Sequence, residues 1–362
     1  MTSIGKSAQR KNINPIRMIV LAAAMMLFTA AGLWAGGNGE AASENFTIAV
    51  FIPGQIQGSP TYELLARGVQ QAADEANDSM DNAEAVSVKV FEAGYNQAEW
   101  GEKLRNLTAT GSYDLIVSSN PSIPDLISNI EPLFPEQKYL VMDAENSGQE
   151  YTAAVMLNQY EQAYLSGYFA GLVSAHDSLE GANSQLKVGL LAGQEYPVMN
   201  NEIQPGYIQG ARDAASPELE VDIRVLGNWY DAEKARELAD SMIRGGVDVI
   251  LTIAGSGNQG VVSAAEAAGT YVLWYDSPGY EYAPGTVLGS SMVNIDELTR
   301  EMVGRAIRRE LKYGETRYVG ISEAAVDYAR DYDEYREFVP EDIRRRMDEL
   351  IDGIADGSIQ IR

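Results

Sequence analysis

The stretch VDIRVLGNWYDAEKARELA, residues 221–239, decides the fold expected for this chain. Its first half is typical of the end of a buried strand. Its second half is typical of an amphipathic helix, with Ala235, Leu238 and Ala239 on one apolar stripe. Asp231 stands where the helix begins and can accept hydrogen bonds from its first N–H groups. A strand that leads directly into a helix indicates one βαβ unit of a parallel sheet.

Strand-like and helix-like runs alternate along the rest of the chain, and the plan occurs twice. VDIRVLGNWYD can be laid without a gap over VSVKVFEAGYN, residues 86–96. The interval from Asp114 to Asp143 is 29 residues, and the interval from Asp248 to Asp276 is 28. The sequence therefore predicts an α/β protein of two similar lobes, each a doubly wound parallel sheet, joined by crossing strands.

The order of the segments gives the expected domains. Two extended runs, 152–158 and 285–294, are placed to carry the chain between the lobes. We expect a signal segment at 1–35, a linker at 36–45, a first lobe from 46–155 together with 290–362, and a second lobe from 156–289.

The N-terminal segment has the order of a secretory signal. Four basic residues precede an apolar run from Met18 to Phe28, and small residues follow up to Ala35, where we expect cleavage. The apolar run is too short to cross a bilayer core of ~30 Å. The chain has no cysteine, so it lacks the usual residue for lipid attachment and has no disulfides. These features predict export to the periplasm, and they leave open whether the signal is cleaved or retained as an anchor.

Charge and composition exclude several classes of function. The net charge is −25, and without residues 1–35, which hold four basic and no acidic groups, it becomes −29. Such a surface repels nucleic acid and anionic lipid. The one histidine, His176, lies in a polar stretch and is given no role. We expect no metal, no cofactor and no catalytic residue.

The candidate ligand residues lie in the loops that follow the strands, because open α/β sheets bind ligands outside the carboxyl ends of their strands. Strand alternation directs Trp229 or Tyr230 away from the sheet core, where a ring can stack on a flat heterocycle. A carboxylate at a strand end can accept two hydrogen bonds from a sugar diol. The expected ligand-binding residues are Tyr62, Ser119, Asn120, Asp143, Tyr207, Trp229, Tyr230, Gly255 and Asp276.

The glycine pattern Gly255-x-Gly257-x-x-Gly260 offers a different function. It follows a strand and precedes a helix, as in a dinucleotide-binding fingerprint. The pattern lies late in the chain rather than in the first βα turn, where that fold places it. An NAD-dependent enzyme is therefore the less favoured alternative, and the glycines are interpreted as a close backbone approach to a ligand.

Five stretches together resemble the basic membrane protein family of ABC-transporter solute-binding proteins. They are YEQAYLSGYFAGLVS, PGYIQGARDA, GNWYDAEKARELA, GVDVILTIAGSGNQGVVSAAEAAG and VPEDIRRRMDELIDGIADGSI. The resemblance implies a type I periplasmic-binding fold and a purine nucleoside or riboflavin held between aromatic rings, one from each lobe. Trp229 falls on the second-lobe aromatic position and Tyr62 lies near the first. Gly255 and Asp276 fall on the family's glycine loop and sugar-contacting aspartate.

The expected function is that of an extracytoplasmic solute-binding component of an ABC importer. Its lobes would close by a hinge on a flat heterocycle with a ribosyl or ribityl chain. The expected partners are this small molecule and a permease in the inner membrane, and we expect a monomer. A sugar-binding or sensory receptor of the same fold remains the alternative.

Overall fold

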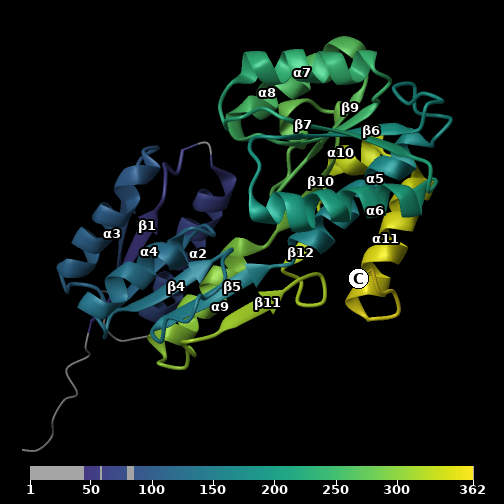
Figure 1. Ribbon diagram of the computed structural model, residues 1–362. Helices are drawn as coiled ribbons and strands as arrows, with labels where there is room; N and C mark the ends of the chain where they lie inside the picture. The colour runs from purple at the N-terminus through teal and green to yellow at the C-terminus, as the bar shows by residue number, and fades with distance from the viewer. Residues whose placement is uncertain (1–44, 58, 80–84, 362) are drawn as a thin grey trace, which may run out of the picture. The chain divides into compact units, whose positions relative to one another are not determined.

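The computed structural model describes residues 45–57, 59–79 and 85–361. The expected signal segment and nearly all of the expected linker lie outside these residues. Within them, two six-stranded sheets are flanked by helices (Figure 1). The predicted α/β class with two lobes of mostly parallel strands is therefore confirmed.

The first sheet has the strand order β11-β5-β4-β3-β1-β2, and all its pairs are parallel. Helices α3 and α4 cover one face, and α2 and α9 pack together on the other. The elements are β1 (Phe46–Ile52), α2 (Pro60–Asp78), β2 (Val86–Glu92), α3 (Trp100–Ala109), β3 (Leu115–Ser119), α4 (Ile123–Ile130), β4 (Lys138–Met142), β5 (Thr152–Leu157), α9 (Ile295–Ile307) and β11 (Thr316–Val319).

The second sheet has the order β12-β10-β9-β8-β6-β7, and only the β10–β12 pair is antiparallel. Helices α7 and α8 pack together, as do α5 and α6, and α11 lies against α5. The elements are α5 (Gln159–Ser174), β6 (Lys187–Ala192), α6 (Gln204–Ala214), β7 (Glu220–Val225), α7 (Ala232–Arg244), β8 (Val249–Ile253), α8 (Asn258–Ala268), β9 (Tyr271–Trp274), β10 (Val287–Val293), β12 (Val326–Tyr328), α10 (Asp333–Phe338) and α11 (Glu341–Ala355).

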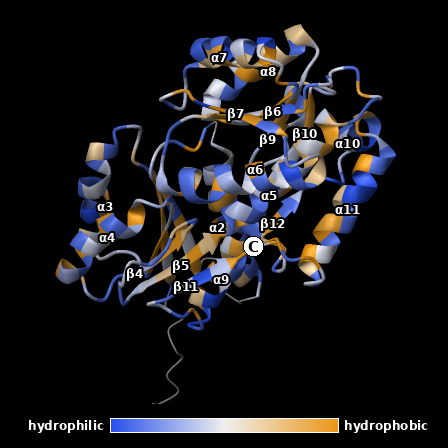
Figure 2. Ribbon diagram, turned by 45° about the vertical axis from the view of Figure 1, so that its right-hand side comes forward, coloured by the Kyte–Doolittle hydropathy of each residue, from blue (hydrophilic) through white to orange (hydrophobic). Residues whose placement is uncertain are grey.

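Strand alternation builds the core. Ile48, Val50 and Ile52 face α2, while Ala49 and Phe51 face α3 and α4, because successive side chains of a strand point to opposite faces. Figure 2 shows the apolar residues gathered in the strands and polar residues spread over α7 and α11. None of the described helices is both long and apolar enough to cross a membrane.

The chain passes between the two sheets three times. It leaves β5 for α5, leaves β10 for α9, and leaves β11 for β12. Because β12 pairs with β10 and α11 packs on α5, we propose that the C-terminal residues from 326 onward group with the second lobe. All of 290–362 had been expected in the first lobe.

Candidate functional site

Two aspartates follow equivalent strands of the two sheets. Asp143 comes directly after β4, and Asp276 comes two residues after β9. In the first sheet Leu140 of β4 pairs with Val117 of β3, and in the second sheet Leu273 of β9 pairs with Leu251 of β8. Each aspartate stands three residues after the leucine of its own strand. Both have positive φ angles, 51° and 71°. The near-equal intervals in the sequence, which end at Asp143 and Asp276, thus arise because the two aspartates occupy equivalent positions at the carboxyl edges of the two sheets.

Helix α5 brings these two aspartates into one hydrogen-bonded network. Gln159 Nε2 donates to Asp143 Oδ1 at 3.1 Å, and Gln162 Nε2 donates to Asp276 Oδ1 at 3.0 Å. The hydroxyl of Tyr275 donates to Gln159 Oε1 at 2.9 Å. Side chains from the ends of both sheets therefore meet at the first turn of one helix.

Burial raises the pKa of both carboxyl groups, and the charge of Asp143 also raises that of Asp276. Burial raises the pKa of Asp143, and the bond from Gln159 partly opposes this shift. Burial, followed by the charge of Asp143, raises the pKa of Asp276 to about 6, against the lowering effect of Gln162. Among the described residues no lysine or arginine forms an ion pair with either carboxylate. Such a site disfavours anionic ligands and suits neutral or cationic ones.

An aromatic ring lies against a glycine in each lobe. The ring of Tyr62 lies where a Cβ on Gly54 would come within 3.1 Å of it. The indole of Trp229 lies still closer to Gly193, where an added Cβ would be 2.4 Å from Cε3. Both rings are half-buried, and each stands near the end of the first strand of its lobe. The glycines permit these positions because they carry no side chain.

Tyr196 joins Trp229 on the second-lobe side. The two ring centroids are 6.1 Å apart with the planes tilted by 50°. Burial raises the pKa of Tyr196, and the charges of Asp276 and Asp143 raise it further. Tyr196 therefore lies between the indole and the carboxylate pair, within electrostatic range of both aspartates.

The structure corrects the ungapped overlay of 86–96 on 221–231. In the first lobe Glu92 pairs with Ile52, and the N–H groups of the next two residues, up to Gly94, donate to carbonyl groups at the end of β1 and just beyond it. In the second lobe Val225 pairs with Ala192, and the next two N–H groups, up to Gly227, donate in the same way at the end of β6. One residue separates Gly94 from Asn96, which precedes a 3-10 turn, Gln97–Glu99, that leads into α3, whereas three separate Gly227 from Asp231, which precedes α7. The two strands therefore correspond with an offset two residues different from that of the ungapped overlay. Trp229 lies in the additional residues between Gly227 and Asp231.

The structure places the remaining predicted residues as follows. The hydroxyl of Tyr62 donates to the carbonyl of Pro53 at 3.1 Å, and Asn120 lies near enough to this hydroxyl to lower its pKa against the larger, raising effect of burial. Ser119 is 1% exposed, and Gly255, with φ 59°, lies against the carbonyl of Trp229. Asp231 caps α7 by accepting from Lys234 N at 3.0 Å, as expected.

Tyr207 and Tyr230 do not join this group. Tyr207 was expected in a loop, but it lies in α6 with 0% exposure, and its hydroxyl donates to the carbonyl of Gly189 at 2.9 Å. An added Cβ on Gly167 of α5 would be 2.0 Å from the Tyr207 carbonyl, so this segment is packed core. Tyr207 is therefore buried in α6 and does not lie among the residues of the candidate site. The side chain of Tyr230 is 75% exposed.

Sequence reasoning missed Gln159, Gln162, Tyr275 and Tyr196. The two glutamines stand three residues apart in NQYEQAY, and that spacing put them on one helix face. Tyr196 lies in the loop after β6, a place that the rule of strand carboxyl ends already favours. Among the described residues no cluster of histidine and acidic side chains could hold a metal ion.

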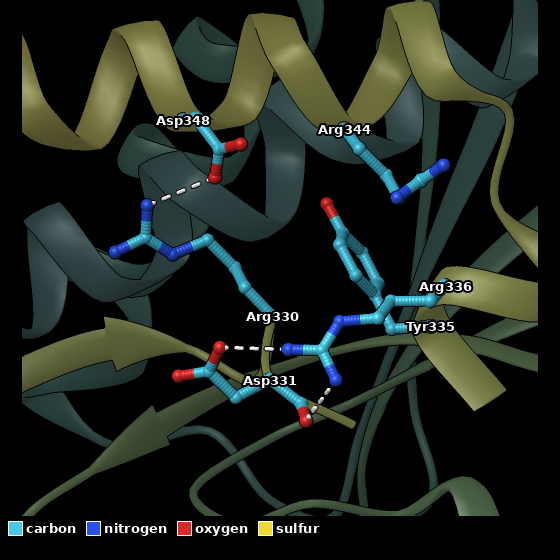
Figure 3. A pocket seen from close by; sticks show the side chains of 6 residues that line it. All are labelled: Arg330, Asp331, Tyr335, Arg336, Arg344 and Asp348. Carbon is cyan, nitrogen blue, oxygen red and sulfur yellow. Dashed lines mark hydrogen bonds and ion pairs between the residues drawn. The ribbon is translucent and has the colours of Figure 1, made fainter. Parts of the chain in front are cut away.

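A separate cavity of about 360 Å³ lies between the segment after β12, α10 and α11 (Figure 3). Its charged residues largely neutralise one another. Arg330 contacts Asp348 at 3.0 Å, and Arg336 contacts Asp331 at 3.0 Å. Because β12 runs antiparallel to β10, this cavity lies away from the strand ends that carry Asp276. It is therefore not part of the candidate site.

Residues 46–355 match the family model of the PnrA-like ABC transporter substrate-binding proteins. The chain belongs to this family. It is accordingly a non-enzymatic solute-binding component of an ABC transporter, and its partners are a ligand and a transporter. The alternative of an NAD-dependent enzyme does not hold. The family is one of extracytoplasmic binding proteins.

Individual proteins show the same relationship. Basic membrane protein A1 of Borrelia garinii subsp. bavariensis is 22% identical over 89% of this chain and 90% of its own length. The ABC transporter nucleoside-binding protein BmpA of Lactococcus lactis subsp. cremoris is 26% identical over 50% of this chain and 46% of its own length. The crystal structure of an ABC transporter solute-binding protein from Aeropyrum pernix K1 has a TM-score of 0.74. It is 20% identical and covers 88% of this chain and 93% of that one.

Proposed function

We propose that the chain binds a neutral, nucleoside-like or riboflavin-like solute between its lobes, a flat heterocycle that carries a ribosyl or ribityl chain. The observation that supports this most is the pair Asp143 and Asp276, whose Oδ2 atoms form no hydrogen bond with any of the described residues. These two oxygens can accept the hydroxyl groups of a sugar chain. The half-buried rings of Tyr62 and Trp229 offer apolar faces for the heterocycle.

The electrostatics of the site support an uncharged solute. The groups whose charges raise the pKa values of Asp276 and Tyr196 are carboxylates, and no basic side chain opposes them. A phosphorylated nucleotide would meet this negative field without a compensating cation. The printed name of the Lactococcus relative, a nucleoside-binding protein, is consistent with this choice.

The mechanism proposed is hinge closure of a monomer in the periplasm. The three passages of the chain between the sheets would act as the hinge, and closure would remove water from the rings and complete the hydrogen bonds. A permease in the inner membrane would then recognise the closed form. Export by the N-terminal segment belongs to the same proposal.

The test is a binding screen on the purified chain. Thermal shift and calorimetry with purine nucleosides, pyrimidine nucleosides, riboflavin, free sugars and NAD should give a stabilised complex with a nucleoside or with riboflavin. Mass spectrometry of any small molecule that co-purifies would identify the natural ligand directly. Stabilisation by free sugars alone would favour the sugar-binding alternative, and no response to nucleosides or riboflavin would refute the proposal.

A further inference from the structure

Two glutamines of α5 each hold one of the site aspartates. Gln159 is 8% exposed and Gln162 is 0% exposed, so neither is a surface residue that reaches a carboxylate by chance. The Nε2 group of each glutamine donates a hydrogen bond to the Oδ1 atom of one aspartate, at 3.1 and 3.0 Å. Residues three apart on a helix are neighbours on one face, so a single helix turn serves both lobes.

The glutamines are themselves held from the second lobe. The Tyr275 hydroxyl donates to Gln159 Oε1 at 2.9 Å and comes from the residue before Asp276. Gln162 Nε2 also lies 3.5 Å from Ser291 Oγ, on β10, and that hydroxyl accepts a hydrogen bond of 2.9 Å from Ser166 of α5. The amide of Gln159 is thereby held at both its oxygen and its nitrogen and that of Gln162 at its nitrogen, whereas Gln162 Oε1 is buried and has no hydrogen-bond partner among the described residues.

This arrangement leaves one free oxygen on each carboxylate. Oδ1 accepts from the amide, whereas Oδ2 has no hydrogen-bond partner within the part of the chain that the structure describes and is not fully buried. An amide N–H favours the ionised carboxylate without bringing a charge of its own. The carboxylates therefore stay hydrogen-bond acceptors. Because each amide holds its carboxylate at Oδ1, it also sets the direction in which the free Oδ2 points.

We propose that Gln159 and Gln162 are positioning residues of the ligand site, which hold Asp143 and Asp276 as two oriented acceptors, one from each lobe. This inference rests on the proposed function and refines its specificity. A ligand with two hydroxyl donors on its sugar chain satisfies both free oxygens. A deoxy analogue leaves one buried carboxylate oxygen without a donor, which costs affinity.

The experiment compares Gln162→Leu and Gln159→Leu with the wild-type chain on a ribonucleoside and its 2′- and 3′-deoxy analogues. The wild type should prefer the ribonucleoside by roughly 10- to 100-fold over at least one deoxy analogue, the range for a hydrogen bond to a charged group. Each Leu variant should lose affinity for the ribonucleoside and much of this preference. Gln209→Leu is the matched control, because it removes an exposed 2.7 Å bond to Asp213 and should change neither value.

Gln162→Glu gives a readout that depends on the protonation of the site and not on its packing. At pH 8 its carboxylate cannot donate to Asp276, and it adds a negative charge beside those of Asp276 and Asp143. The nearby Tyr196 and Tyr275 are neutral at this pH, because burial raises the pKa of both. As the pH falls, the two carboxyl groups can share one proton and restore the hydrogen bond. The affinity of this variant should therefore rise between pH 8 and pH 6, whereas that of the wild type should not.

The outcomes separate this inference from the proposed function. The positioning role would be overturned if all three variants kept the wild-type preference for the ribonucleoside over its deoxy analogues. It would also be overturned if the affinity of Gln162→Glu did not change with pH, while nucleoside binding itself stands. If the wild type binds neither nucleosides nor riboflavin, the proposed function fails. The positioning role is then decided with ribose and 2-deoxyribose on the same variants, and equal discrimination by all of them would overturn it.

Discussion

Asp276→Asn should stabilise the free protein at neutral pH while it weakens ligand binding. The substitution keeps the shape of the side chain and leaves an oxygen that can accept from Gln162 Nε2, now at 3.0 Å. Asparagine also tolerates the φ angle of 71° at this position. The change therefore removes one buried negative charge and little else.

The magnitude follows from the pKa of Asp276, which burial raises from 3.8 to about 6. This difference corresponds to an unfavourable free energy of about 3 kcal/mol for the ionised form in the folded state. Because the side chain is partly exposed, we reduce this to about 2 kcal/mol. The folded pKa exceeds the unfolded one, so the penalty is absent below pH 3.8, grows as the pH rises, and is complete above pH 6.

Thermal unfolding of the ligand-free protein measures this effect. At pH 7.5 the Asn variant should melt on the order of 4 °C above the wild type, and the two should converge by about pH 4. Asp222→Asn is the control, since it removes a 2.9 Å ion pair with Arg224 and should lower the stability slightly. A variant that melts below the wild type at pH 7.5, or a difference that does not change with pH, would refute the reasoning.

Three further predictions concern the ligand complex. Trp229→Ala should weaken binding by roughly 5- to 150-fold in calorimetry, the effect of losing a ring stack of ~1–3 kcal/mol. Tyr230→Ala, at the next and exposed residue, should leave the Kd unchanged, and equal losses in both would contradict this assignment. Gly193→Ala places a Cβ 2.4 Å from the indole, so it should displace the ring, change the tryptophan fluorescence and lower affinity, whereas Gly304→Ala in α9 should do neither. Wild-type affinity for the ligand should fall below about pH 6 as Asp276 gains a proton, and constant affinity down to pH 5 would show that its charge is not used.

The sequence was sufficient for the fold and for part of the site. Alternating strands and helices, with near-equal intervals between aspartates, predicted two sheets and placed Asp143 and Asp276 at matched positions. Both inferences depend on periodicity and on the rule that ligands bind beyond strand ends, which are local properties. The assignment of a ring at residue 229 to the ligand side rested on the same alternation, and that role remains a proposal.

The errors came from long-range packing. The run QPGYIQGA was expected among the loops that follow the strands, yet it lies in α6, which continues directly from the π-helical segment Met199–Ile203. Gly206 and Gly210 let α6 approach α5 closely, which buries Tyr207. Gln162 is polar within an apolar helix, and only its partners, Asp276 after β9 and Ser291 on β10, show why it is there. No local pattern contains that information.

The shifted register explains how a duplicated fold can acquire an asymmetric site. The two lobes share their strands, their aspartates and the glycines Gly94 and Gly227 at the ends of the second strands. After these glycines the first lobe has one residue before Asn96 and the 3-10 turn that leads into α3, and the second has three residues before Asp231 and α7, with Trp229 in the middle. An indole on the additional residues can reach back over Gly193, whereas the first lobe must use Tyr62, from the start of α2, to cover Gly54. The two additional residues therefore place a larger ring over the glycine of the second lobe than over that of the first, so the proposed site has a different aromatic ring on each side.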